Sequence, residues 1–364
     1  MSHARKRRGW KADLLWFLLF LALGQVGLIL LLEWRLPELH DVEYGMRLRL
    51  LKKRIVEAPA RPLCLVVGSS RLTMGFLPEQ LPLLRSASGE EVLPFNFGHL
   101  GGGPLINLMN LRRLLREGIR PRWVVLEVVP TLMEDQSPWM AVRLSFAADL
   151  PLLQRYIDTT TVWGVYLRTR LNPWYSKRLG LLRRYASCLA QDSGDIERIR
   201  LKPLGGDDGW IVFTKMDDEE KRRRTASIRA SYFEGLQNYH IEPLPDRALR
   251  ECLDLCRHEG IECVLLVTPE SSEYRSWYSA DGLECFHRYC DKLCAEYGVP
   301  LIDAGTWGAD EQFIDGTHLM RGGAEAFTAR LGRELFEPLV AGRLHGISDA
   351  SQKGCRLDAS AKRR

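Results

Sequence analysis

Residues 63–72 read LCLVVGSSRL, an apolar run that stops at a glycine followed by two serines. A short, continuous apolar run ended by a glycine turn is typical of a strand that is buried on both faces of a parallel sheet. Four further runs of this kind recur along the chain, at 92–97, 123–129, 261–267 and, in a shorter form, 299–303.

Helical patterns lie between these runs, notably at 105–117, 246–259, 282–297 and 323–339. Strands that alternate with helices predict a parallel sheet whose right-handed crossovers place helices on both faces. We therefore predict an α/β fold of three layers around a five-stranded parallel sheet. Such a sheet carries its functional site at the carboxyl ends of its strands.

An uncharged run from Leu14 to Leu32 precedes the first predicted strand, and only Gln25 and two glycines interrupt it. Its 19 residues, at about 1.5 Å each, just span a hydrocarbon core of about 30 Å. A cleaved signal peptide would have a shorter apolar region and a small-residue cleavage site after it, whereas charged and aromatic residues follow here. The run predicts an uncleaved transmembrane anchor at 14–32, between a basic tail at 1–13 and a short helical stalk at 33–60.

The charges on the two sides of the anchor predict its orientation. Five Lys or Arg residues precede the run, whereas Arg35 alone lies just after it. By the positive-inside rule, the N-terminus is then cytoplasmic and everything after residue 33 lies outside the cytoplasm, in a periplasm or beyond.

The formal net charge of +5 is concentrated at the two ends of the chain. Residues 1–13 and 343–364 carry +4 each, so subtracting these eight charges leaves −3 for the body. A mildly acidic body lacks the clustered basic face that binding to a nucleic-acid backbone needs, and we predict no nucleic-acid partner. The basic run at 221–224 follows four acidic residues and reads as a salt-bridged helix face. The polar tail at 341–364 is predicted to be disordered.

Ser70 lies where the first predicted strand ends, just after the glycine turn. At the start of the next helix its hydroxyl is exposed, and backbone N–H groups of the turn can donate to an oxyanion. A serine after a glycine turn is also an ordinary helix N-cap.

The stretch FIDGTHL at 313–319 precedes the last predicted helix and holds Asp315 and His318. A serine nucleophile needs a base to take its proton and a carboxylate to hold the imidazole in the right tautomer. An Asp three residues before a His on one loop supplies both. The alternatives are a helix cap and a metal site.

These three residues, in this order, resemble the SGNH (GDSL-like) hydrolases, whose fold is flavodoxin-like. Ser70 matches the nucleophile of that family, with Ser69 where the family usually has Asp, and Asp315 and His318 match its D-x-x-H block. The segment NFGHLG at 96–101 matches a further block, N-x-G-x-x-G, whose last glycine is Gly101. The resemblance covers roughly 61–340, apart from much of an insert, and implies that the N–H groups of Ser70 and Gly101 hold an oxyanion.

The chain departs from this pattern after the third predicted strand. The family usually has an asparagine there as a second oxyanion donor, whereas residues 123–131 contain none and Thr131 lies nearest the expected position. Loss of one such donor costs about 100- to 1000-fold in other acyl-transfer enzymes. Three alternatives follow. Thr131 or a group of the insert replaces the asparagine as oxyanion donor, or the enzyme is slow, or the domain binds its ligand without turnover.

The pattern is similar to a divergent, membrane-anchored branch that includes the alginate O-acetylation and lipoteichoic D-alanylation accessory proteins. This resemblance implies an acyl esterase or O-acyltransferase without a cofactor, acting on an envelope or extracellular polysaccharide beside a membrane-bound O-acyltransferase. The alternative is a non-catalytic binding or scaffold protein of an envelope assembly. A lipase is a third reading, and the insert shows no long apolar lid that would favour it.

Three residues near the predicted site are candidates for substrate binding: Arg71, His99 and Glu270. Arg71 could hold an anionic substrate or form a salt bridge that caps the turn, and His99 could be a structural donor. The stretch 138–240 carries few strand signals and predicts a mainly helical insert. Its aromatic residues could stack on sugar rings or pack the insert onto the sheet; they are Trp163, Trp174, Tyr175 and Trp210.

Nine cysteines are too few for a disulfide scaffold in a chain of 364 residues. Cys252 with Cys256, and Cys290 with Cys294, form i,i+4 pairs at core-facing positions of predicted helices. Buried thiols or an occasional disulfide are favoured over a thiolate metal site. We therefore predict no metal.

Overall fold

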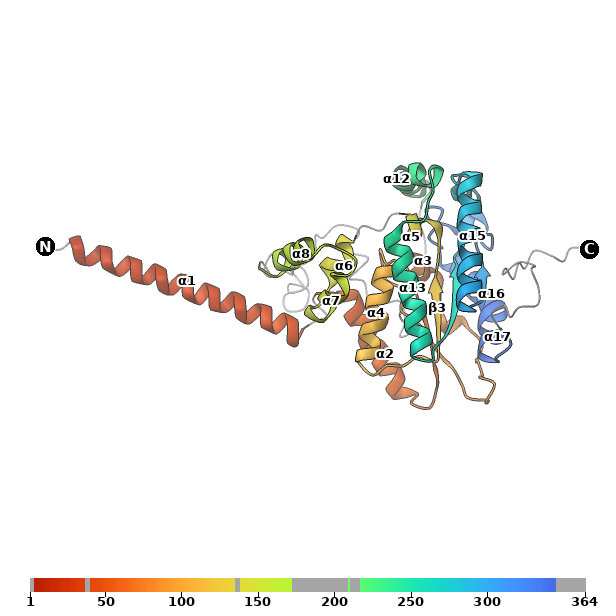
Figure 1. Ribbon diagram of the computed structural model, residues 1–364, viewed down its shortest axis with the longest axis horizontal. Helices are drawn as coiled ribbons and strands as arrows, with labels where there is room; N and C mark the ends of the chain where they lie inside the picture. The colour runs from red at the N-terminus through yellow and green to blue at the C-terminus, as the bar shows by residue number, and fades with distance from the viewer. Residues whose placement is uncertain (1–2, 37–39, 135–137, 172–208, 210–216, 345–364) are drawn as a thin grey trace, which may run out of the picture. The chain divides into compact units, whose positions relative to one another are not determined.

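The computed structural model describes residues 3–36, 40–134, 138–171, 209 and 217–344 (Figure 1). The chain divides into two compact units. The first comprises Met1–Met46 and Pro138–Leu201, and the second comprises Arg47–Ser137 and Lys202–Arg364.

The second unit contains the predicted five-stranded, all-parallel sheet, which confirms the α/β fold class. The strand order is β2-β1-β3-β4-β5, so β2 is added on one side of β1 and β3, β4 and β5 are added in turn on the other side. This is the flavodoxin-like order. The strand bounds are Leu63–Val67 for β1, Leu93–Asn96 for β2, Trp123–Glu127 for β3, Glu262–Val267 for β4 and Leu301–Asp303 for β5.

Helices cover both faces of the sheet, because right-handed crossovers change face when the strand order changes direction. Helix α4 (Pro104–Arg116) and helix α13 (Pro243–His258) pack side by side on one face (Figure 1). On the other face, α3 (Ser70–Gly75) packs against α16 (Arg321–Leu331). The core of that second face joins Leu72, Phe76 and Phe327 to Val66 and Val125 of the strands.

The second unit has further helices, of which α15 (Ala280–Tyr297) lies in the crossover from β4 to β5. The others are α5 (Pro130–Glu134), α12 (Asp218–Gln237), α14 (Ser272–Arg275), α17 (Glu337–Val340), a π-helical turn at Gly332–Phe336 and short 3-10 helices at Pro78–Gln80 and Asp310–Gln312. Helix α15 shows how the sequence sets such ends: the Ser279 hydroxyl accepts the N–H of Gly282 at its start, and Gly298 ends it at φ +66°. A hydroxyl N-cap and a left-handed glycine C-cap are the favoured terminators of helices.

The first unit is helical in the parts that the structure describes. Helix α1 (His3–Trp34) contains the predicted anchor, and its segment Trp10–Trp34 is long and apolar enough to cross a membrane. Helices α6 (Trp139–Leu144), α7 (Leu150–Leu153) and α8 (Thr159–Leu171) belong to the predicted insert.

Helix α2 (Val42–Glu57) occupies most of the segment predicted as a stalk, and the unit boundary falls within it. It is helical as expected, but it buries Tyr44, Arg47 and Leu51, so part of it belongs to packed structure. Several predictions fall outside the described residues: Trp174, Tyr175 and Trp210 of the insert, and the tail from 345 onward.

The cysteines of the described residues are free thiols. Six of these seven are buried, and Cys285 is partly buried. In the same part of the chain, no cluster of His, Cys, Asp or Glu could hold a metal ion. The i,i+4 pairs at 252/256 and 290/294 are therefore buried thiols in this structure, while Cys188 and Cys355 lie outside the described residues.

Candidate active site

The turn after β1 presents Ser70 as the first residue of α3. Its neighbour Ser69 is the N-cap, since the Ser69 hydroxyl accepts the N–H of Arg71 at 3.2 Å. The capping role that a serine commonly has after a glycine turn thus belongs to Ser69. The hydroxyl of Ser70 is left half-exposed and available for chemistry.

A tight loop before α16 presents Asp315 and His318. An antiparallel bridge between Phe313 and Leu319 closes the loop, and the N–H of Ile314 donates to the carbonyl of His318 at 2.8 Å. The buried carboxylate of Asp315 accepts the backbone N–H of His318 at 3.0 Å. The loop is thereby held by its own hydrogen bonds.

The fold brings the three predicted side chains together, although 248 positions separate Ser70 from His318. The Ser70 Oγ lies 2.7 Å from His318 Nε2, and His318 Nδ1 lies 2.8 Å from Asp315 Oδ2. Since a carboxylate only accepts, Nδ1 carries the proton and Nε2 accepts the serine O–H. This is the arrangement that a general base and its orienting carboxylate require.

Asp315 remains ionised in this loop. Burial on its own raises the pKa of the carboxyl. The positive charge that His318 has when it is protonated, its hydrogen bond, and the backbone N–H groups of Thr317 and His318 bring that pKa well below its ordinary value. A negative charge is therefore held beside the imidazole, where it stabilises the imidazolium that forms during proton transfer.

We expect the stabilising contribution of Asp315 to be lost in acid. A carboxyl whose pKa is depressed by folding contributes fully above its unfolded pKa of about 4, and the contribution disappears as pH falls through the folded pKa. The difference in unfolding free energy between wild type and Asp315→Asn should shrink between about pH 5 and pH 2, measured by urea unfolding. A difference that does not change with pH over this range would contradict the direction of the pKa shift.

The glycine block at 96–101 lies beside the nucleophile turn. The Asn96 side chain donates to the carbonyls of Leu72 and Phe76 at 2.8 Å each, and the N–H of His99 donates to the Gly68 carbonyl at 2.8 Å. A Cβ on Gly98 would come within 2.7 Å of the Thr73 hydroxyl. The predicted block is thus tied to α3 by hydrogen bonds and by close backbone approach.

Two backbone N–H groups at this junction are candidates for an oxyanion hole. As the first helical residue, Ser70 has an N–H without an intrahelical acceptor, and Gly101 has φ +68°, which suits glycine. Within the described residues, neither N–H donates to a protein acceptor.

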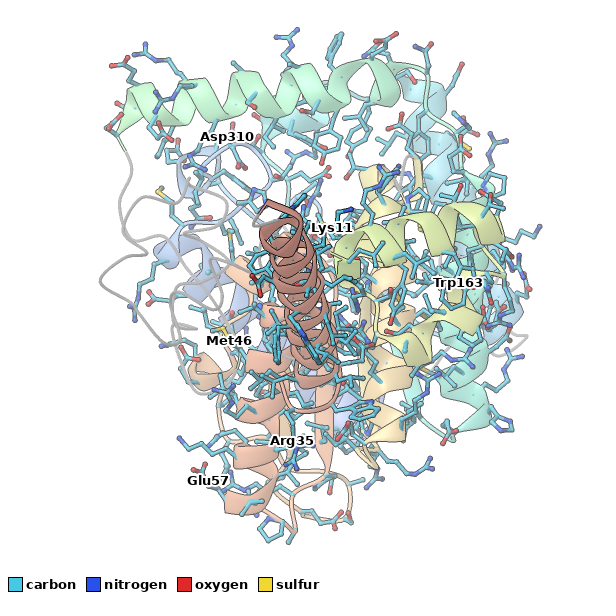
Figure 2. All side chains as sticks on the ribbon, turned by 90° about the vertical axis from the view of Figure 1, so that its left-hand side faces the viewer. Lys11, Arg35, Met46, Glu57, Trp163 and Asp310 are labelled. Carbon is cyan, nitrogen blue, oxygen red and sulfur yellow. The ribbon has the colours of Figure 1, made fainter. Side chains whose placement is uncertain are left out.

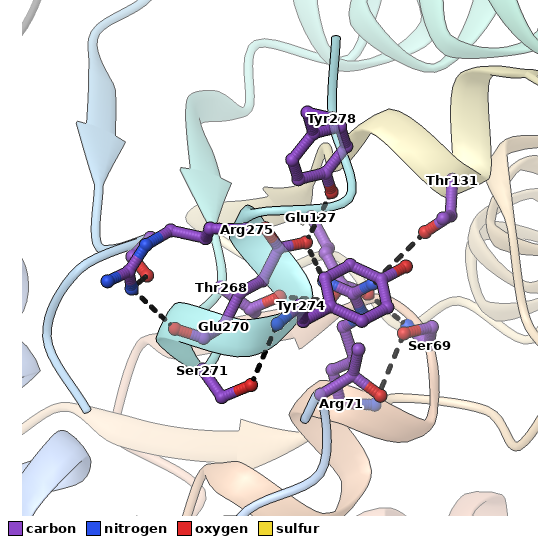
Figure 3. Close-up of polar contacts among 12 residues, drawn as sticks. Ser69, Arg71, Glu127, Thr131, Thr268, Glu270, Ser271, Tyr274, Arg275 and Tyr278 are labelled. Carbon is purple, nitrogen blue, oxygen red and sulfur yellow. Dashed lines mark hydrogen bonds and ion pairs between the residues drawn. The ribbon is translucent and has the colours of Figure 1, made fainter. Parts of the chain in front are cut away.

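Three side chains that were predicted to bind substrate or to complete the oxyanion hole contact one another in one network: Arg71, Glu270 and Thr131 (Figure 3). Arg71 is buried, and its guanidinium donates to Glu270 Oε1 at 2.6 Å, to the Thr131 hydroxyl at 3.1 Å and to the Tyr274 hydroxyl at 3.3 Å. Tyr278 donates to the same Glu270 oxygen at 2.8 Å. The alternative in which Arg71 forms a salt bridge at the turn is the one that the structure shows, and Thr131 is engaged by Arg71.

His99 is also enclosed by protein. Its ring is buried, with Nδ1 3.0 Å from the carbonyl of Leu100. This contact agrees with the alternative in which His99 is a structural hydrogen-bond donor. Of the predicted site residues, Ser70, His318 and Asp315 therefore form one cluster, Gly101 lies in the adjoining block, and Arg71, Glu270 and Thr131 form a second, buried network.

Glu127 is a site residue that the sequence analysis did not single out. It ends β3, is fully buried, and accepts the N–H of Ser69 and the hydroxyl of Thr268 (Figure 3). It therefore fixes the turn behind the nucleophile from the neighbouring strand. A glutamate that ends an apolar strand at the carboxyl edge of a parallel sheet is the signal that could have found it.

Comparison with protein-family models matches residues 15–323 to the family described as "Protein of unknown function (DUF1574)". The match covers well over half of the chain, so the chain belongs to this family. A search of curated proteins found no match.

Proposed function

We propose that this member of the DUF1574 family is a membrane-anchored serine ester hydrolase or O-acyltransferase of SGNH type. The observation that carries the proposal is the hydrogen-bonded series of Ser70, His318 and Asp315, with 2.7 Å from Ser70 Oγ to His318 Nε2 and 2.8 Å from His318 Nδ1 to Asp315 Oδ2. A buried carboxylate, an imidazole and a half-exposed hydroxyl in this order are the components of nucleophilic acyl transfer.

In the first step, His318 Nε2 takes the proton of the Ser70 hydroxyl while Ser70 Oγ attacks the carbonyl carbon of an ester. The negative charge that develops on the carbonyl oxygen is stabilised by the N–H groups of Ser70 and Gly101. The imidazolium then returns its proton to the departing alcohol oxygen as the bond from carbon to oxygen breaks. The product is an acyl ester on Ser70.

In the second step, water or a glycan hydroxyl enters the site in place of the alcohol that has left. His318 takes its proton, its oxygen attacks the acyl carbon, and the proton passes to Ser70 Oγ as the enzyme ester breaks. Water as the nucleophile gives hydrolysis, and a glycan hydroxyl gives acyl transfer. We propose a polysaccharide of the cell envelope or of the extracellular space as the acceptor or substrate, on the basis of the resemblance described above.

We propose further that α1 anchors the chain in a membrane with its N-terminus in the cytoplasm, so that the domain with Ser70 acts outside it. The apolar segment Trp10–Trp34 supports the anchor, and the excess of basic residues before it supports the orientation. A membrane-bound O-acyltransferase as donor of the acyl group is the partner that fits this arrangement.

A non-catalytic binding protein is the second candidate, and the state of Thr131 favours it. The Thr131 hydroxyl is buried and accepts the guanidinium N–H of Arg71 at 3.1 Å. Its oxygen therefore belongs to the network of Arg71 and Glu270, at the position nearest to where the SGNH hydrolases have the asparagine of their oxyanion hole. A domain with a weak oxyanion hole would bind its polymer without measurable turnover.

Labelling with a fluorophosphonate probe tests the leading proposal. The probe should modify Ser70 in the full-length protein, and Ser70→Ala and His318→Ala should remove the labelling, because the serine is nucleophilic only with its base. Ser88→Ala, which alters a serine exposed on the surface, should label like wild type. Absence of labelling in folded wild type, together with polymer binding retained in Ser70→Ala, would favour the binding protein.

A further inference from the structure

Helix α8 exposes an apolar stripe that consists of Trp163, Leu167 and Leu171. These side chains are 42%, 45% and 66% exposed, and their i, i+4, i+8 spacing puts them on one face of the helix. Val162 and Val165 of α8, which are buried, lie on the opposite side. Scattered apolar residues are ordinary on a protein surface, whereas an aligned stripe that includes a Trp marks a face with a partner.

A cluster of polar side chains joins α8 to the end of α1, and Figure 2 shows α8, with Trp163 labelled, beside α1. Glu33, next to the end of α1, accepts the hydroxyl of Tyr166 at 3.1 Å and pairs with Nε of Arg170 at 3.4 Å and with His40 at 3.0 Å. The Arg170 side chain is only 4% exposed. A shielded carboxylate between a guanidinium and an imidazole holds two helices at one level more firmly than an exposed pair does.

A second contact between α8 and α1 lies farther from the C-terminal end of α1, at Gln25, the one amide side chain of its apolar run. Gln25 Nε2 donates to the carbonyl of Leu171, the last described residue of α8, at 2.9 Å. Between Gln25 and Leu32, the end of the run, α1 rises by about 10 Å. Helix α8 therefore extends alongside the apolar run, and Leu171 lies at the level of Gln25.

We propose that the stripe of α8 is embedded in the bilayer leaflet on the side of the folded domain, as a second membrane contact beside α1. If α1 crosses the membrane, Gln25 lies about 10 Å inside the end of the apolar run, at the depth of the lipid acyl chains. Leu171, at the same level, is then surrounded by acyl chains as well. Trp163, toward the other end of the stripe, then lies near the headgroups, where Trp is favoured. The exposed Arg168 can reach the headgroups along its apolar stem.

This inference rests on the membrane anchor of the proposed function and is independent of the chemistry at Ser70. It also explains why an amide interrupts an otherwise apolar run: Gln25 holds the end of α8 at depth. The first unit then contacts the membrane through two helices whose relative positions are fixed by Glu33 and Gln25.

Depth-dependent quenching in lipid bilayers tests the proposal on the full-length chain. A fluorescent amino acid is placed at 171, 167 or 160 on α8, and at 21 within α1, in phosphatidylcholine vesicles that contain lipids brominated on their acyl chains. We expect quenching to decrease in the order 171, 167, 160, with position 171 quenched about threefold more than the exposed position 160 near the start of α8. Gln25→Leu should lower the quenching at 171 about twofold and leave the quenching at position 21 unchanged, because it removes the hydrogen bond to the Leu171 carbonyl but keeps α1 apolar.

The outcomes separate the parts of the proposal. A probe at 171 that is quenched by aqueous iodide and not by brominated lipid, while position 21 is quenched by lipid, would overturn the membrane contact of α8 and leave the anchor intact. A probe at 171 shielded from both quenchers would also overturn it, in favour of a protein partner on the stripe. Absence of lipid quenching at position 21 would overturn the anchor as well, and fluorophosphonate labelling of Ser70 would still decide the chemistry.

Discussion

Replacing Ser70 by alanine is expected to lower the turnover of a short aryl ester by about 10⁶-fold, the size of the loss when other serine hydrolases lose their nucleophile. His318→Ala should cost about as much, and the double variant should lose little more, because the hydroxyl and the imidazole act as one unit across their 2.7 Å contact. Initial rates of acetyl-ester hydrolysis by the full-length protein measure these losses.

The Asp315→Asn variant should lose less, about 10⁴-fold, because an amide can present its N–H to Nδ1 and thereby favour the wrong tautomer of His318. Its remaining oxygen can still accept the backbone N–H groups of the loop, so the variant should fold at neutral pH. Ser88→Ala serves as the control with unchanged rate. Losses below tenfold for Ser70→Ala and His318→Ala, in a wild type with measurable turnover, would show that the reaction does not pass through this hydroxyl.

Removing Glu270 is expected to destabilise the fold by about 3–5 kcal/mol, the usual cost of leaving a buried charge without its partner. The Arg71 and Glu270 side chains are 7% and 5% exposed. In Glu270→Leu the guanidinium of Arg71 loses its carboxylate while it stays buried. Burial on its own lowers the pKa of Arg71, but Glu270, together with the neighbouring Tyr274, Tyr278 and Glu127, raises that pKa above its ordinary value. The midpoint of urea unfolding, followed by Trp fluorescence, measures the loss.

Two further variants show whether the loss is due to the unpaired charge. The double variant Arg71→Met with Glu270→Leu should recover at least half of it, because no buried charge then remains. Glu325→Gln breaks an ion pair with Arg321 in which both side chains are more than 40% exposed, and it should cost less than about 0.5 kcal/mol. A loss below about 1 kcal/mol for Glu270→Leu would mean that the Arg71 charge finds water or another acceptor.

The five strands were predicted from the sequence because a strand buried on both faces needs a continuous apolar run, and that requirement is local. Once the strand order is given, right-handed crossovers decide which face of the sheet each helix covers, and this handedness is a general property of L-amino-acid chains. The sequence also pointed to Ser70, Asp315 and His318, because each lies at a strand end or in a loop of recognisable composition. It could not supply the distance between them, since 248 positions separate Ser70 and His318.

Partners in a folded chain are chosen by proximity in space, and the sequence alone leaves that undecided. From the sequence, Arg71 could hold an anionic substrate or form a salt bridge. The fold then placed Glu270, 199 positions away, against its guanidinium. Glu127 ends a predicted strand, yet its contact with Ser69 exists only because β1 and β3 are neighbours. Gln25 reads as an interruption of an apolar run until α8 brings the carbonyl of Leu171 to it. The sequence by itself determined which segments are apolar and which residues carry chemistry, because these are properties of single side chains. The tertiary structure decided which of those residues meet, because the energy of a buried polar group depends on the partner beside it.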